Sequence, residues 1–221
     1  MATSCAYYPH LTGVPLINKK GDTKIEGGFT IAPSATATVS HGLTDKIAIQ
    51  AAGAIGGGAG FYYDSDTRGK SVYYLQGATG LFKSRENRNV LELYGGFGFG
   101  YGYSENHDIG EKFGNYQVYF AQFNFGKANS EIKNTDYGLG LKMGYIHANM
   151  TENRNFDNDF KPPYSTYKYD GVLVEPQLFF RIGGEKLKFQ TTIGACGIFR
   201  NTNNQFPIFP LNLGLGLSYR F

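Results

Sequence analysis

The chain has 221 residues, 41% of them hydrophobic, with 31 glycines, 17 tyrosines, 18 phenylalanines and no tryptophan. Its net charge is +3, and cations are interspersed with carboxylates, which excludes the basic stripe of a nucleic-acid-binding protein. No run approaches the roughly 18 consecutive apolar residues of a membrane-spanning helix. The mean hydropathy of -0.32 does not exclude a membrane barrel, because its strands are apolar on one face only.

Apolar residues alternate with polar or small residues along the whole chain. In KIEGGFTIA, for example, Ile25, Gly27, Phe29 and Ile31 share one face of a strand. No capping box precedes a helical repeat, so the fold class is all-β. We expect ten strands, with eight also possible; in chain order they cover 22–32, 34–42, 45–56, 70–83, 88–103, 115–127, 133–149, 169–183, 186–199 and 210–221.

The connections between these segments alternate in length from the second strand onward. Short turns are expected at 43–44, 84–87, 128–132 and 184–185, where turn-forming residues are found. Longer loops are expected at 57–69, 104–114, 150–168 and 200–209. The first hairpin, at Pro33–Ser34, is an exception, because it is tight although it lies at the end where the other connections are long. This pattern predicts an antiparallel up-and-down barrel.

A soluble barrel and a transmembrane barrel place opposite faces inward. The less apolar face carries charges of both signs together with Gly96, Gly98, Gly100 and Gly102, which suit a narrow interior better than a solvent-covered surface. The apolar face carries aromatic residues near strand ends, as in the girdles of membrane barrels. We therefore predict a transmembrane β-barrel with a polar, filled lumen. The expected lumen network is Glu26, Lys46, Glu92, Lys142, Glu175, Arg181 and Lys188.

The last six residues, Gly216-Leu217-Ser218-Tyr219-Arg220-Phe221, resemble the C-terminal β-signal of bacterial outer-membrane proteins. The resemblance implies an outer-membrane location and recognition of Gly216, Tyr219 and Phe221 by the barrel-assembly machinery. Gly214 departs from the pattern, which prefers a polar residue there. An even strand number then places both termini in the periplasm.

The N-terminal stretch around Cys5 resembles the start of small barrel lipoproteins of Bacteroidota. Small residues precede Cys5, and Cys5-Ala6-Tyr7-Tyr8-Pro9 follows the pattern of such starts. The resemblance implies that Cys5 carries a lipid anchor; an unmodified thiol is the alternative. We expect residues 1–21 to form an N-terminal periplasmic segment and residues 22–221 to form the barrel domain.

The sequence offers few candidates for chemistry. Cys196 is expected to be a small buried residue, and no spacing of cysteine and histidine predicts a metal site or cofactor. Of the four histidines, His10 and His41 lie away from the outer rim, whereas His107 and His147 could pair with a loop carboxylate. Loop or interface positions explain these histidines more simply than catalysis does.

We expect a non-enzymatic structural or accessory subunit of a larger outer-membrane complex, serving nutrient uptake or secretion. Its expected partners are outer-membrane lipids, the barrel-assembly machinery and a larger membrane protein. A narrow pore for small solutes is one alternative, although ten strands leave little space beyond their side chains. A lipid- or peptide-hydrolysing enzyme is the other alternative.

Overall fold

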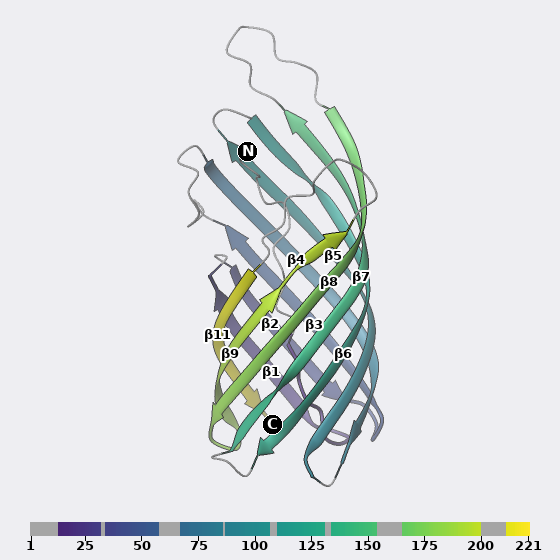
Figure 1. Ribbon diagram of the computed structural model, residues 1–221, viewed down its shortest axis with the longest axis vertical. Helices are drawn as coiled ribbons and strands as arrows, with labels where there is room; N and C mark the ends of the chain where they lie inside the picture. Colours follow the sequence, from purple (N-terminus) through teal and green to yellow (C-terminus); the bar gives the residue numbers. More distant parts are fainter. Residues whose placement is uncertain are drawn as a thin grey trace, which may run out of the picture.

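The computed structural model describes residues 13–31, 34–57, 67–85, 87–106, 110–130, 134–153, 165–199 and 211–221, and they form a closed antiparallel barrel (Figure 1). The strands are β1 (Thr23–Thr30), β2 (Ser34–Gly42), β3 (Ile47–Gly57), β4 (Thr67–Ser84), β5 (Asn89–Asn106), β6 (Gly110–Ser130), β7 (Thr135–Asn153), β8 (Ser165–Gly183), β9 (Leu187–Ala195), β10 (Gly197–Phe199) and β11 (Leu211–Arg220). Neighbours along the chain are paired, and β11 closes the barrel between β1 and β9.

The segments β9 and β10 form one strand that is interrupted at Cys196. Both pair with β8 in a single register, with Gly194 opposite Gln177 and Gly197 opposite Val174. The barrel therefore has ten strands, which confirms the prediction from the sequence. Within the described residues, no helix is long and apolar enough to cross a membrane.

Alternation along the strands separates an apolar outer surface from a buried interior. Outward residues such as Phe29, Phe189 and Leu215 are 73%, 69% and 69% exposed, whereas inward Glu92 and Arg181 are fully buried. Apolar outward side chains around a polar inner face are typical of a transmembrane barrel.

The wall of the barrel has two heights. Strands β4 to β8 have 18 to 21 residues, whereas β1, β2, β3, β9 and β11 have 8 to 11. The long strands extend well beyond the short ones at the end that carries the longer loops (Figure 1). About 9–11 residues suffice to cross a bilayer at a tilt, so the long strands exceed that requirement.

The polarity of the two faces inverts in the upper part of this tall wall. On β7 the outward series is apolar from Tyr137 to Tyr145 and continues with His147, Asn149 and Thr151. The register aligns His147 with Gln117 of β6 and with Asp170 of β8, so the apolar band ends at one level on three adjacent strands. Most inward residues around this level are apolar and form an upper core, which includes Tyr116, Val118, Ile146, Ala148, Met150 and Leu173. Beyond the core, the buried Glu152 is polar again and pairs with Lys112 at 3.3 Å. The predicted polar lumen is therefore interrupted by an apolar layer, and most of its charged network lies in the half near the short turns.

Strand extension also corrects one predicted loop. A connection over 104–114 was expected, but β5 continues to Asn106 and β6 begins at Gly110. The error arises because polar outward residues in this region, such as Glu105 and Glu111, obscure the alternation. Strands also extend into the predicted loops 57–69 and 150–168, whereas β10 ends at Phe199 as predicted and β11 begins one residue later than predicted.

Inward glycines of β5 make room for aromatic rings that cross the upper lumen. A Cβ at Gly98 would lie 2.1 Å from Tyr74 Oη, and one at Gly100 would lie 2.1 Å from Tyr116 Cζ. The Tyr74 and Tyr116 rings stack with centroids 5.9 Å apart. This confirms the expectation that the glycines accompany converging side chains, although these side chains are mainly aromatic.

The variant Gly100→Ala should lower the free energy of unfolding by about 1–3 kcal/mol, because the new methyl group overlaps the Tyr116 ring. Gly95→Ala on the outer face of the same strand is the matched control, since a Cβ there meets no atom within 4 Å. It should be neutral or stabilising by about 0.5–1 kcal/mol. Urea titration of the refolded barrel in lipid vesicles measures both values; equal stability of the two variants would contradict the packing described.

Candidate functional site

The lumen near the short turns is filled by the chain's own N-terminal segment, residues 13–18. Val14, Leu16 and Ile17 are at most 2% exposed, and they lie inside the barrel. The chain then turns at residues 19–21, where Gly21 has a φ of +79°, and continues into β1. The described part of the predicted periplasmic segment 1–21 thus includes residues inside the lumen. The segment lies inside the lumen because burying the side chains of Val14, Leu16 and Ile17 there removes apolar surface from water.

The backbone of this segment hydrogen-bonds to side chains of the wall, without pairing to a strand. Carbonyl oxygens at positions 13 to 16 all accept a hydrogen bond from an inward side chain. The donors to Gly13 are Gln50 Nε2 at 3.0 Å and Gln122 Nε2 at 3.3 Å; those to Val14, Pro15 and Leu16 are Arg181 Nη2 at 2.7 Å, Lys24 Nζ at 2.8 Å and Arg220 Nη2 at 2.9 Å. The Ile17 amide donates to Glu92 Oε1 at 2.7 Å. A buried extended segment needs such partners, because unpaired backbone groups are costly to bury.

The apolar side chains of the segment complete two small clusters. Val14 and Leu16 pack with Val90, Ala128 and Phe179 of the wall. In the second cluster, Ile17 joins Ala48, Phe82 and Tyr94. The segment therefore contributes both apolar packing and hydrogen-bond acceptors to the interior.

Charged side chains around the segment form a cluster centred on Asp136. Its carboxylate lies 3.3 Å from Lys24 Nζ, 2.5 Å from Lys188 Nζ and 3.8 Å from Arg181 Nη1. Arg181 also pairs with Glu26. Arg220 pairs with Asp22 at 3.2 Å. Pairing and hydrogen bonding offset the large penalty of burying these charges.

The structure places most of the predicted lumen network inside the barrel. Six of the seven residues are buried: Glu26, Glu92, Lys142, Glu175, Arg181 and Lys188. The seventh assignment is wrong, because Lys46 is exposed in the turn between β2 and β3. Lys24 and Asp136 also belong to this network and were not predicted, although Lys24 stands two residues before Glu26 and shares its face.

A second polar group separates the segment from the apolar upper core. Lys142 Nζ lies 3.2 Å from the Glu175 carboxylate and donates to Gln76 Oε1 at 3.0 Å. The same ammonium lies 4.7 Å from the centre of the Phe120 ring, a cation–π contact. Above it, the apolar core of β4 to β8 also contains the buried free thiol of Cys196. Among the described residues, both levels of the lumen are thus filled.

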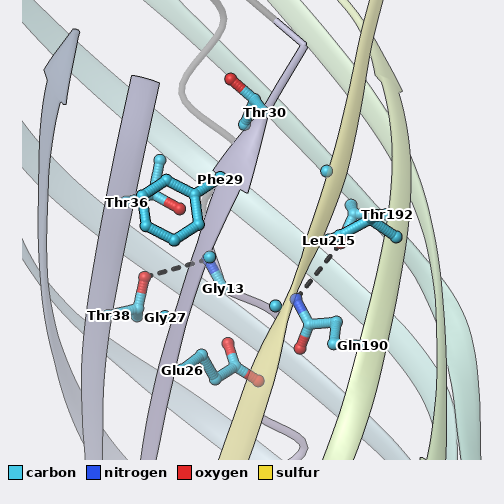
Figure 2. A pocket seen from close by; sticks show the side chains of 13 residues that line it. Gly13, Glu26, Gly27, Phe29, Thr30, Thr36, Thr38, Gln190, Thr192 and Leu215 are labelled. Carbon is cyan, nitrogen blue, oxygen red and sulfur yellow. Dashed lines mark hydrogen bonds between the residues drawn. The ribbon is translucent and has the colours of Figure 1, made fainter. Parts of the chain in front are cut away.

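A cavity of about 20 Å³ remains beside Gly13, between β1, β2, β9 and β11 (Figure 2). Figure 2 shows the Gly13 amide facing Thr38, to whose Oγ1 it donates at 3.3 Å, and Glu26 below them. This volume holds about one water molecule. It is too small for a substrate or transported solute.

The outer wall carries a histidine–carboxylate pair at the edge of the apolar band. His147 Nδ1 lies 2.6 Å from Asp170 Oδ1, and the two side chains are 34% and 45% exposed. The Tyr145 hydroxyl also hydrogen-bonds to Asp170. None of the hydrogen bonds described for His147 involves a hydroxyl or thiol that could act as a nucleophile.

The remaining candidate residues have simple surroundings or lie outside the described residues. His41 Nδ1 forms a hydrogen bond with Thr23 Oγ1, at 2.7 Å, near the short turns. Cys5, His10 and His107 lie outside the described residues. Among those that are described, no group of three or more His, Cys, Asp or Glu side chains could hold a metal ion.

The C-terminal residues of the assembly signal belong to the strand that closes the barrel. Gly216 faces Gly28 of β1 so closely that a Cβ on it would lie 2.3 Å from the Gly27 carbonyl oxygen. Tyr219 and Phe221 meet edge to face on the outer surface, with ring centroids 4.8 Å apart. Gly216 therefore has a packing role in closure, and its recognition during assembly stays a prediction.

Comparison with known proteins gives likenesses of fold at low identity. The N-terminal β-barrel domain of OprF from Pseudomonas aeruginosa is 13% identical over 91% of this chain and 98% of that one, with a TM-score of 0.38. The translocator domain of the autotransporter NalP from Neisseria meningitidis is 10% identical over 90% of this chain and 86% of that one, with a TM-score of 0.46. No protein-family model and no curated protein sequence matches the chain. Likeness at this level implies no shared function.

The variant Asp136→Asn should lower the free energy of unfolding by about 3–5 kcal/mol, because it leaves three buried cations without their shared counter-charge. Asp170→Asn, the same change in the half-exposed pair on the outer wall, should lower it by less than about 1 kcal/mol. Denaturant unfolding of both refolded variants provides the comparison. A small effect at Asp136 would mean that the cluster is not the buried network described.

Proposed function

We propose that the chain is a non-enzymatic barrel of the bacterial outer membrane, acting as a structural or accessory subunit of a larger complex for nutrient uptake or secretion. The observation that carries this proposal is the filled lumen inside an apolar outer surface. The outer surface suits a bilayer, and the interior formed by the described residues leaves no room for cargo. A function of this barrel then belongs to its outer face or its loops.

The outer face of β1 to β5 supports a protein partner, because small residues run across it among larger apolar side chains. This small-residue face comprises Gly27, Ala37, Ala51, Gly53, Gly77 and Gly95. The register makes it continuous, with Gly27 opposite Ala37, Ala37 opposite Gly53, and Ala51 opposite Gly77. A Cβ on Gly77 or Gly95 would meet no atom within 4 Å, so packing within the chain does not require these glycines. Within a membrane, small residues let another backbone approach closely.

The two alternatives have weaker support. A pore would need a path past residues 13–18 and past the apolar upper core, and both are tightly packed. A hydrolytic enzyme would use His147 and Asp170, but such a centre also needs an activated nucleophile, and none is described beside the pair.

The orientation of the barrel follows from its loops within this proposal. Short turns face the periplasm in bacterial outer-membrane barrels. Phe221 lies at the short-turn end, where its amide donates to the Thr23 carbonyl at 3.0 Å. The C-terminus and the start of β1 would therefore be periplasmic. A lipid on Cys5 and recognition by the barrel-assembly machinery remain parts of the proposal that await their own tests.

Site-specific photo-crosslinking in intact cells tests the partner. A photoreactive residue at Ala51, in the centre of the small-residue face, should crosslink to one larger membrane protein. The matched control is Leu178 on β8, outward and 59% exposed on a different part of the wall. It should label lipid and give no discrete protein adduct.

A bulky substitution provides the second arm of the same experiment. Gly77→Phe should abolish the adduct formed from Ala51 while leaving the folded, heat-modifiable barrel intact, since the new ring points away from the chain. Absence of a discrete adduct at Ala51, or equal adducts at Ala51 and Leu178, would contradict a partner on this face.

A further inference from the structure

A cationic hollow lies on the outer wall at the short-turn end of β4, β5 and β6. It measures about 100 Å³ and is lined by Lys83, Arg85, Asn89, Val90, Leu91 and Phe125. Lys83, Leu91 and Phe125 stand side by side in the strand register, Lys83 opposite Leu91 and Leu91 opposite Phe125. We refer to it as the rim hollow.

The cations at the rim hollow have no counter-charge among the described residues. Lys83 and Arg85 are exposed, and neither takes part in the salt bridges described for the barrel. Lys127 adds a third cation on the same wall, because it lies opposite Asn89, two residues beyond Phe125. The lumen, by contrast, pairs its cations with carboxylates. Among the described residues, the rim hollow therefore carries a net positive charge.

The floor of the rim hollow is continuous with the apolar outer surface. Leu91 is 43% exposed and Phe125 is 44% exposed. The next outward residues away from the turn are Leu81, Leu93 and Phe123, which are also exposed. An apolar surface thus leads directly to a cationic edge at the end of the band.

A phospholipid has the same arrangement of groups, with an anionic phosphate directly attached to apolar acyl chains. Arginine binds phosphate through two parallel N–H donors, and lysine adds a flexible point charge. Acyl chains would lie on Leu91 and Phe125 while the phosphate reaches Lys83 and Arg85. The Asn89 side chain supplies a neutral polar group beside them.

We propose that the rim hollow binds the phosphate of a phospholipid headgroup and prefers an anionic lipid over a zwitterionic one. The proposal rests on the membrane location proposed above, but not on the protein partner. Because each cation near an anionic lipid strengthens the attraction about five-fold, two cations give a clear preference. High salt should weaken the preference.

The absence of tryptophan from the chain permits a direct test by fluorescence quenching. Phe125→Trp places a single reporter on the floor of the rim hollow. The protein is refolded into vesicles with equal amounts of phosphatidylglycerol and phosphatidylcholine, in which one lipid or the other is brominated. Bilayer composition stays constant, so a difference in quenching reports which lipid contacts the reporter.

Brominated phosphatidylglycerol should quench the reporter of the Phe125→Trp variant with a relative binding constant at least about five-fold above that of brominated phosphatidylcholine. Adding Lys83→Gln and Arg85→Gln should reduce the ratio to about one. Lys46→Gln, in the exposed turn between β2 and β3, is the matched control and should leave the ratio unchanged. Equal quenching by the two lipids, or a preference that survives the double substitution, would overturn the proposal.

A second reporter separates failure of the lipid site from failure of the membrane location. Phe180 lies on β8, points outward and is 47% exposed. The Phe180→Trp variant places a reporter there. Both brominated lipids should quench it to the same extent. If neither brominated lipid quenched either reporter, the membrane location would be rejected. If both lipids quenched both reporters, and to the same extent at each reporter, only the lipid site would be rejected.

Discussion

The interior of this barrel depends on hydrogen bonds from wall side chains to the backbone of residues 13–16. An extended segment that is not part of the sheet would otherwise bury bare carbonyl groups, each of which is costly. Arg181 has two structural roles, because it donates a hydrogen bond to the Val14 carbonyl and forms an ion pair with Glu26. The charge cluster therefore both fills the lumen and holds the segment that fills it.

The same sheet has two different distributions of polar and apolar side chains. Near the short turns the outside is apolar and the inside polar. Beyond the level of His147 and Asp170 the outside of β7 and β8 is polar, and an aromatic and aliphatic core fills the inside around this level. The strands keep their two-residue period through the change, so only the chemistry of the faces is exchanged. A filled interior at both levels directs attention to the outer wall, to the small-residue face and to the rim hollow.

The sequence predicts the barrel well because its evidence is local. Alternation and turn residues identify ten strands, and the prediction of ten strands is confirmed. Alternation gives no signal where both faces are polar, as near Glu105 and Glu111, and the predicted loop there is wrong because β5 and β6 continue into it. Alternation correctly places the side chains of Glu92 and Arg181 in the lumen. It fails at Lys46, because a residue in a turn does not belong to either face of a strand. Insertion of residues 13–18 leaves no periodic signal, since its hydrogen bonds join positions as distant in the chain as Leu16 and Arg220.

Thiol accessibility of the N-terminal segment tests the central claim most directly. In a chain with Cys5→Ser and Cys196→Ser, a single cysteine is placed at Leu16, which is fully buried, or at Lys20, which is exposed after the turn. A water-soluble maleimide should label the Lys20→Cys barrel rapidly and the Leu16→Cys barrel only after unfolding in urea. Equal labelling of the two folded barrels would contradict a segment packed inside the lumen.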